Sequence, residues 1–517
     1  FKKTDSFNME DVTCILRAVD LSNVVHLTPR KAGSVQPDLM LPADRLSSQQ
    51  AGGTWAELFS PGSWLNQYPA LGAVVWYFLI TLLGWITYPI LRIATKTLAD
   101  RGYGISKIIG LVILSYFSWL LGSTGVAFSQ LNILFVLLGI TIISGVLFAL
   151  QLREIKSDIK DLKKLFVGVE LLSLTLFLVF LGIRLGNPDL WHPYKGGEKP
   201  MDFSYFNAVL KSTSFPPYDP WFAGGYINYY YYGFVIVGTP VKLLGITPSV
   251  AYNLILPTLF SLVGSAAFSL GYTLVDSLNN PEVRNLSDRI RRRIFNTRLA
   301  SEDPTVVLPS DSHDDEYPSE RITFESVPIR TVENVEPDRE TERSQVNPAA
   351  ILGGLASTLL LLILGNLGSL RMIWHGLIRI ASPTVTLENS SYINRILWSI
   401  QGLIKMFQGA QFTYPVGDWY WIPSRTIPGE PITEFPFFTF LYADMHAHMI
   451  ALPLTLAALA WAFSILLRNW VWQEKSDRIS GWIQFCITLF IGALIVGALR
   501  PTNTWDLPTY LAVCSIA

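Results

Sequence analysis

The sequence predicts an all-α fold, a polytopic helical membrane protein with about nine or ten transmembrane helices and one long outward loop. Three observations support this fold class. Of the 517 residues, 50% are hydrophobic and only 15% are charged, whereas soluble domains are about 25% charged. Apolar runs of about 18 residues or more recur along the chain. Lys and Arg gather in alternate short loops, as they do on the cytoplasmic side of multi-pass proteins.

The apolar runs are long enough to cross a bilayer as helices. The clear candidates are 71–91, 106–124, 131–150, 165–185, 249–275, 350–370, 449–467 and 482–499. A ninth run, 229–246, contains Pro240 and Lys242, and a tenth begins after Asp506. We therefore expect a multi-pass protein of the cell (plasma) membrane, with the lipid bilayer as its main partner.

Basic residues in the short loops predict the orientation of the spans. The loop after the first span holds Arg92, Lys96, Arg101 and Lys107, and the loop after the third holds Arg153, Lys156, Lys160, Lys163 and Lys164. The loop between them, GSTGVAFSQ, carries no charge. The fourth span therefore delivers the first extracytoplasmic loop, 186–228, to the outer side. Arg468, Lys475 and Arg478 place 371–447 and 500–506 on the outer side as well.

The sequence leaves the side of the charged stretch 276–348 open. If 229–246 does not cross the bilayer, this stretch is cytoplasmic, which its basic segment RIRRRIFNTR favours. If 229–246 does cross, one further crossing is needed, such as 393–410, and the stretch lies outside. Its high charge and few aromatic residues predict a disordered linker or a weakly ordered insertion.

Four regions follow from these patterns: an extramembrane segment 1–68, an N-terminal membrane region 69–275, the linker 276–348, and a C-terminal membrane region 349–517. The chain starts at Phe1 rather than Met and stops inside an apolar run, so we expect a piece of a longer polypeptide, truncated in its last region. Lys and Arg number 39 and Asp and Glu number 40. This balance gives no sign of a nucleic-acid partner.

The first outer loop combines acidic residues with many aromatic rings, a composition that suits carbohydrate binding. Sugar CH groups stack on rings while sugar hydroxyls bond to carboxylates. Its candidate acids are Glu198 and Asp202. For the Tyr run alone, an interfacial aromatic belt is the alternative. The candidate substrate-binding residues of this loop are His192, Asp219, Trp221, Tyr229, Tyr230 and Tyr231.

A second cluster, Asp444, His446 and His448, precedes a long apolar run. In an extended segment all three side chains point to one face, whereas on a helix Asp444 and His448 share a face without His446. Imidazole and carboxylate groups are ligands for divalent metal ions. The cluster therefore predicts a metal or phosphate site, and a divalent metal is the one cofactor that the sequence suggests. A polar helix entry at the membrane surface is the alternative.

Two further groups of polar residues on the outer side are candidates for substrate contacts. Arg425 and Glu434 stand among aromatic residues, where an Arg can hold a phosphate in a bidentate manner. The alternative for this Arg is a side chain that snorkels to the lipid headgroups. The second group is Arg500, Asn503 and Asp506, of which Asp506 has the position of a helix N-cap.

Four stretches carry a resemblance to one protein family. They are DPWFAGGYINYYYYGF, SRTIP, EFPFFTFLYADMHAHMIALP and RPTNTWDLPTY. From about residue 70 to its end the chain resembles the bacterial and archaeal YYY membrane proteins, which are named for their Tyr run and are largely uncharacterised. That family commonly has Asp-Leu-His-Pro-His where Met445 and Ala447 stand here, so the polar triad is kept. The opening residues weakly resemble the end of a glycosyltransferase-like module.

The YYY family is similar in layout to the GT-C integral-membrane glycosyltransferases, such as protein O-mannosyltransferases. The resemblance implies a transferase that moves a sugar from a polyprenyl-phosphate donor to a glycan acceptor on the outer face. It implies that an acid in the first outer loop is the catalytic base, for which Asp202 is the first candidate and Glu198 the second. The leaving phosphate then needs Arg425, Arg500, or a metal ion on the second cluster.

Two other functions are compatible with the same residues. A transporter or flippase of lipid-linked glycan would use the aromatic rings without breaking bonds, but it should carry ionisable groups deep within its spans, where this sequence has few. A metal-dependent membrane hydrolase would centre on Asp444, His446 and His448. Bound metal would favour the hydrolase, and conversion of a labelled donor would favour the transferase.

Overall fold

The computed structural model describes residues 39–50, 52–190, 197–278, 347–384, 390–415, 418–427, 431–468 and 479–517. The expectations for residues 1–38, for His192 and for most of the charged linker lie outside these ranges. Within them, regular structure is helical apart from two isolated bridges, Met40 with Gly225 and Tyr218 with Tyr226. The predicted all-α class is confirmed for this part of the chain.

Seven helical stretches are long and apolar enough to cross a membrane. They are α6 (Pro69–Thr95), η2 with α7 (Tyr103–Ser123), α8 (Gln130–Leu150), α10 (Lys163–Gly186), α13 (Pro248–Leu278), α20 (Ala447–Leu467) and α21 (Gly481–Thr502). An eighth crossing is formed if α15 (Pro348–Leu359), the π-helical turn η4 (Leu360–Leu364) and α16 (Leu367–Ala381) are one span, which is bent by 79°. These match the clear candidates from the sequence and confirm a polytopic membrane protein.

The expected ninth span, 229–246, is a short helix. α12 (Tyr231–Leu244) has 14 residues, whereas about 20 are needed to cross a bilayer. The run after Asp506 forms α22 (Leu507–Ile516), which extends to the end of the sequence, so the described residues contain seven spans, or eight with the bent pair. α12 ends because Gly245 adopts the left-handed conformation, with φ of 66°. The hydroxyl of Tyr231, at its start, accepts a bond from Trp119 of α7, and the carbonyl of Leu243 near its end accepts one from Gln130 of α8.

We call the end of the bundle where α6 begins the outer end, following the Lys and Arg pattern, and the opposite end the inner end. Since Trp119 is near the end of α7 and Gln130 begins α8, both ends of α12 lie at the outer end. α12 therefore does not cross the bilayer, and α13 runs from the outer end to the inner end. At the inner end, Thr273 of α13 accepts a bond from the N–H of Ala99, just after α6.

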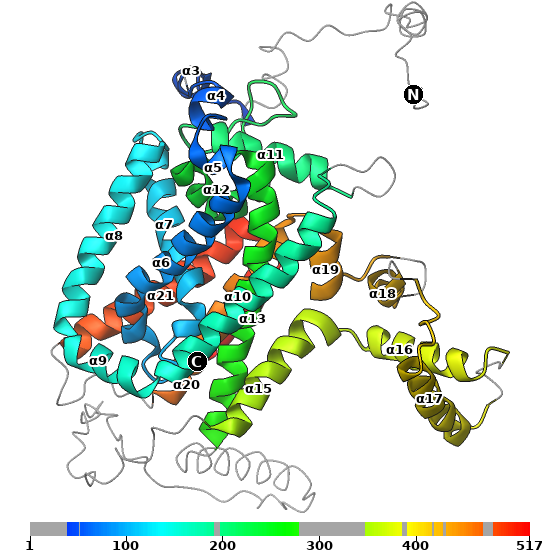
Figure 1. The fold of residues 1–517 in the computed structure, drawn as a ribbon. Coiled ribbons are helices and arrows are strands. Elements are labelled where there is room, and N and C mark those ends of the chain that lie inside the picture. The colour runs from blue at the N-terminus through cyan, green and yellow to red at the C-terminus, as the bar shows by residue number, and fades with distance from the viewer. Residues whose placement is uncertain are drawn as a thin grey trace, which may run out of the picture.

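Helix α13 is the most enclosed span, with 94% of its apolar window buried, whereas only 17% of the corresponding window of α8 is buried. In Figure 1, α13 runs through the bundle with α10 and α15 beside it, and α8 lies at the edge. Small residues permit the close packing of α13 on α15. A Cβ added at Gly271 would lie 2.7 Å from the carbonyl oxygen of Gly353.

The remaining helices lie at the two ends of the bundle or, like α17 (Tyr392–Phe407) and α18 (Asp418–Trp421), to one side of it (Figure 1). At the inner end, α9 (Leu152–Asp161) connects α8 with α10. The other short elements are α3 (Ala43–Gln50), α4 (Trp55–Leu58), α5 (Trp64–Gln67), α11 (Lys199–Lys211), η6 (Ile422–Ser424) and α19 (Pro436–Tyr442). The start of α11 and the turn between α19 and α20 meet at the candidate site.

Candidate functional site

The site is built on two segments that are far apart in the sequence. The first is the start of α11, where Pro200 suits the first helical turn and Asp202 lies near the positive end of the helix dipole. The second is the turn from α19 to α20. Ala443 ends α19 in a left-handed conformation, with φ of 63°. The hydroxyl of Tyr252, on α13, accepts a bond from the N–H of Met445 at 2.8 Å and lies 3.3 Å from the carbonyl oxygen of Ala443.

Asp444 joins the two segments directly. Its Oδ2 accepts a bond from the backbone N–H of Glu198 at 2.9 Å, across 246 residues of sequence. Its Oδ1 lies 3.1 Å from Nζ of Lys199, which also sits 4.9 Å from the centre of the Tyr442 ring. Gly197 has φ of +59°, and a Cβ there would lie 2.2 Å from Oδ2 of Asp444. The close approach therefore requires glycine at this position.

His446 lies among three carboxylates. Its Nδ1 is 3.5 Å from Oδ1 of Asp202, and its Nε2 is 3.5 Å from Oε2 of Glu198 and 3.8 Å from Oδ2 of Asp444. Asp202 is only 1% exposed and Asp444 3%, while the side chain of Glu198 is 57% exposed. The cluster thus has a buried floor and one exposed carboxylate at its edge.

Burial and charge set the protonation of this cluster. Burial raises the pKa of Asp202 above its ordinary value, and the bond and charge of His446 oppose this only in part. For His446, burial alone would lower the pKa, but the hydrogen bond and charge of Asp202 outweigh it, with help from Asp444 and Glu198, and raise the pKa to about 9. Without a bound ligand, His446 is therefore the cationic centre of the cluster near neutral pH.

Two buried carboxylate oxygens of the cluster accept no hydrogen bond among the residues described, Oδ1 of Asp444 and Oδ2 of Asp202. The first has an ion pair with Lys199, whereas the second has none. Oδ2 of Asp202 is buried and makes no hydrogen bond among the residues described, although its other oxygen faces His446. A buried carboxylate oxygen without a partner is costly, because it has lost its water and gained nothing in exchange. This oxygen is a natural place for a proton, a substrate hydroxyl or a metal ion to bind.

Asp202, Asp444 and His446 can also present metal-ligand atoms within 4.8 Å of one another. The sequence pattern suggested His448 as the third ligand with Asp444 and His446. The structure instead brings Asp202 into the group and bonds Nε2 of His448 to Oε2 of Glu434 at 2.8 Å. The donor set of two carboxylates and one imidazole fits a divalent cation. Lys199 competes for the same charge, since it already pairs with Asp444.

Glu434 and His448 form a second pair beside the cluster, with the rings of His446 and His448 5.5 Å apart between centres. Thr439 donates to Oε2 of Glu434 at 3.1 Å. Burial alone would raise the pKa of Glu434, but the bonds from His448 and Thr439 and the charge of His448 lower it below its ordinary value.

The aromatic residues of the first outer loop divide into two groups. The ring of Tyr229 lies 5.8 Å from Tyr205 and 4.8 Å from Tyr230, and its pKa is raised by burial and then by the charges of Glu198 and Asp202. Tyr229 therefore lies near the cluster. Tyr231 instead stacks on Phe215 and accepts a bond from Trp119, so it belongs to the packing around α12.

Trp221 and Asp219 lie on the turn that precedes the Tyr run. The indole of Trp221 is 66% exposed, and its Nε1 donates to Ser204 of α11 at 2.9 Å. Oδ1 of Asp219 accepts bonds from the N–H groups of Trp221 and Phe222. Asp219 thus shapes the turn, and Trp221 offers an open aromatic surface on the outer side.

The other candidates make local contacts. The guanidinium of Arg425 lies 4.3 Å from the centre of the Trp421 ring. Asn503 donates to Oδ2 of Asp506 at 2.9 Å. Asp506 is the N-cap residue of α22, as predicted, but its side chain bonds to Asn503 and not to the backbone of the helix. Thr504 donates to the carbonyl of Arg500. These contacts do not involve Asp202, Asp444 or His446, so a role of these candidates in the cluster stays a prediction.

Sequence reasoning did not assign roles to Gly197, Lys199 or Tyr252. Each acts through its contact with Asp444 or with the turn around it. A polar hydroxyl inside the apolar run 249–275 was the one available signal for Tyr252, and nothing in the sequence pairs it with residue 445. His192 lies outside the described residues.

Comparison with known proteins identifies a family but no activity. The family model described as "Uncharacterized membrane protein (DUF2298)" matches residues 113–517. No curated protein matches the chain, and no solved structure does.

Proposed function

The chain belongs to the DUF2298 family of uncharacterized membrane proteins, and from this premise we propose that it is a GT-C-type glycosyltransferase. It would move a sugar from a polyprenyl-phosphate donor to a glycan acceptor on the outer face of the membrane. One observation carries the proposal: at the outer end of a membrane bundle, Asp202 keeps a buried oxygen without a partner beside His446. The resemblance to the YYY proteins and their GT-C-like layout supports the same class.

In this mechanism Asp202 is the general base. Its Oδ2 accepts the proton of the acceptor hydroxyl while that oxygen attacks the anomeric carbon of the donor sugar. The bond between the anomeric carbon and the phosphate oxygen breaks, and its electron pair leaves with polyprenyl phosphate. The product has the inverted configuration at that carbon. His446 holds the other oxygen of Asp202 at 3.5 Å, which orients the carboxylate toward the acceptor.

The neighbouring groups have matching roles in the proposal. Tyr229 and the exposed indole of Trp221 supply faces on which sugar rings stack. Glu198, at the exposed edge, is the second acid and binds acceptor hydroxyls. Lys199 and His446 bring positive charge to the site, which favours the leaving phosphate. Arg425 and Arg500 are further candidates for phosphate contacts.

The test is transfer from a labelled polyprenyl-phosphate sugar by the purified protein. Asp202→Asn should lower the rate by about 10²–10⁴-fold, because a positioned base contributes a factor of that size. Asp44→Asn, on the exposed surface of α3, is the matched control and should leave the rate unchanged. Full activity in a variant with both Asp202→Asn and Glu198→Gln would exclude the base assignment. Absence of transfer from every polyprenyl-phosphate sugar tried would exclude the transferase.

A metal-dependent hydrolase is the second candidate, because Asp202, Asp444 and His446 place their ligand atoms together. A bound divalent cation would supply a Lewis acid and an activated water there. If the site takes a metal, Mn²⁺ should bind the purified protein, and His446→Ala should weaken binding at least about tenfold. His448→Ala is the control, since His448 pairs with Glu434. Equal Mn²⁺ binding by both variants would contradict this ligand set.

The third candidate is a transporter or flippase of lipid-linked glycan, which would move its substrate without breaking a covalent bond. Such a protein needs ionisable groups within its spans. Lys107 and Glu170 lie within spans, but they pair with each other at 2.7 Å, which fits a structural pair. Movement of labelled lipid-linked glycan across vesicles with no new covalent product would favour this alternative over the transferase.

A further inference from the structure

Helix α9 (Leu152–Asp161) connects α8 with α10 at the inner end, on the opposite side of the membrane from the candidate site. It is strongly amphipathic and carries exposed basic side chains. The exposed ones on α9 are Arg153, Lys156 and Lys160, and the next two, Lys163 and Lys164, begin α10. None of these residues has a role in the proposed reaction.

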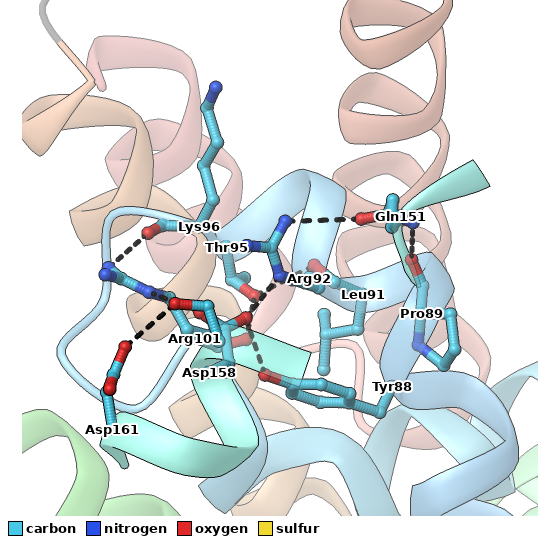
Figure 2. Close-up of polar contacts among 12 residues, drawn as sticks. Tyr88, Pro89, Leu91, Arg92, Thr95, Lys96, Arg101, Gln151, Asp158 and Asp161 are labelled. Carbon is cyan, nitrogen blue, oxygen red and sulfur yellow. Dashed lines mark hydrogen bonds and ion pairs between the residues drawn. The ribbon is translucent and has the colours of Figure 1, made fainter. Parts of the chain in front are cut away.

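Buried polar contacts hold α9 rigidly against the bundle (Figure 2). Asp158 of α9 forms ion pairs with Arg92 and with Arg101, whose Nε lies 3.6 Å from Oδ1, and it accepts a bond from Tyr88 at 3.3 Å. Ile155 is fully buried against the same part of the bundle. These contacts fix the orientation of α9, so its basic side chains all lie on the side that faces away from the bundle.

The helical period places like residues together on that outward side. At about 100° per residue, Arg153, Lys156 and Lys160 fall within roughly a 60° arc of the helix. The exposed apolar residues Leu152 and Ile159 border this arc, on the side toward buried Ile155. Besides the buried Asp158, the acidic residues of α9 are Glu154 and Asp161, and they lie on the remaining side.

An exposed basic arc bordered by exposed apolar side chains is typical of a helix that lies in the membrane interface. The apolar residues enter the acyl region while Lys and Arg reach the headgroups. Next to α9, a groove of about 250 Å³ runs between α6 and α8 and is lined in part by Trp85, Pro89 and Phe148. Gln151, just before α9, donates to the carbonyl of Pro89 at 2.8 Å, so the start of α9 lies next to the groove.

We infer that α9 and the adjoining groove form a binding surface for anionic phospholipids of the inner leaflet. The basic arc contacts the headgroup phosphates, and the groove between α6 and α8 takes an acyl chain. The occupant is a lipid rather than a free anion. Exposed Leu152 and Ile159 and the apolar groove can contact an acyl chain, whereas they contribute nothing to the binding of a small ion. The proposal is independent of the activity at the outer end.

The test measures lipid binding by the whole purified chain in detergent, using native mass spectrometry with phosphatidylglycerol and phosphatidylcholine. We expect the wild type to bind phosphatidylglycerol at least about tenfold more tightly, since each basic residue near an anionic surface contributes a factor of several. A triple variant with Arg153→Gln, Lys156→Gln and Lys160→Gln should lose this preference. A double variant with Glu154→Gln and Asp161→Asn, on the other side of the same helix, should keep it.

Three results would overturn the proposal. They are equal affinity of the wild type for the two lipids, an unchanged preference in the triple variant, and displacement of phosphatidylglycerol by millimolar inorganic phosphate, which would indicate a small-anion site. Thermal melting of each variant in detergent confirms folding. If the triple variant does not fold, Lys163→Gln with Lys164→Gln should reduce the preference in part, and an unchanged preference there also counts against the proposal.

Discussion

At the scale of single residues, the candidate site depends on which partner each polar group receives. Asp444 receives a backbone N–H and an ammonium group, whereas Asp202 receives only His446 and keeps one oxygen open. The two buried carboxylates therefore differ in their contacts. Asp444 ties the two segments together, and Asp202 keeps the open oxygen on which the proposed reaction depends.

The pair of Glu434 and His448 gives a pH prediction. The folded-state pKa of Glu434 is lowered, so its ionised form stabilises the fold above the ordinary pKa of about 4.5. That contribution is lost as the pH falls through the lowered value. Melting curves in detergent should show the wild type losing stability over this range more steeply than Glu434→Gln. Asp44→Asn controls for removing a carboxylate, and identical acid limbs in wild type and Glu434→Gln would contradict the prediction.

The sequence could select Asp202, Asp444 and His446 because acidic and imidazole groups are uncommon in so apolar a chain. It could not select the partner of each one. His446 is the N-cap of α20, in an extended conformation, and His448 lies in the first helical turn, so the two rings face different carboxylates. That difference depends on the residue at which α20 begins and on the position of Glu434. Both are set by tertiary packing, which the sequence pattern does not show.

At the scale of elements, apolar length predicted the spans well, because a helix that crosses lipid must satisfy its own backbone bonds. Apolar composition alone, in a segment whose helix is too short, did not predict a span correctly. The run 229–246 is as apolar as a span, but Gly245 ends its helix after 14 residues, and neighbouring helices cover it. Hydropathy also does not reveal the bend of 79° after η4, because the helices before and after the bend form one continuous apolar run.

The contact between α13 and α15 gives a prediction for an element. A Cβ at Gly271 would lie 2.7 Å from the carbonyl oxygen of Gly353 and 2.1 Å from Oγ of Ser357. Gly271→Ala should therefore destabilise the protein by about 1–3 kcal/mol, the usual cost of overpacking. Gly168→Ala on α10 is the matched control, because nothing lies within 4 Å of its added Cβ. Equal melting temperatures for both variants would show that the two helices separate at little cost.

At the scale of the whole molecule, the position of α12 settles a question that the sequence left open. Since α12 stays at the outer end, α13 ends and α15 begins at the inner end, where Asn347 donates to Asp276 at 3.4 Å. The first of the two alternatives for the charged stretch therefore applies at its described ends. Charge counting alone could not decide this, because long loops follow the Lys and Arg rule poorly.

This arrangement predicts the side from which the stretch between α13 and α15 can be reached. A protease site placed between residues 279 and 346 should be cut in inside-out vesicles and protected in right-side-out cells. The same site placed at Gly125, between α7 and α8 at the outer end, is the outer-side control and should show the reverse pattern. Cleavage of the first site from outside would require α12 or another segment to cross the bilayer.

The bond between Glu198 and Asp444 has a consequence for the covalent chain itself. The two segments it joins are aligned by α13, which carries Tyr252 and packs along α15. These contacts hold the two halves of the described structure together through their packed interface. We therefore expect that two separately translated halves, the first ending at Leu278 and the second starting at Asn347, reconstitute the same cluster by fragment complementation.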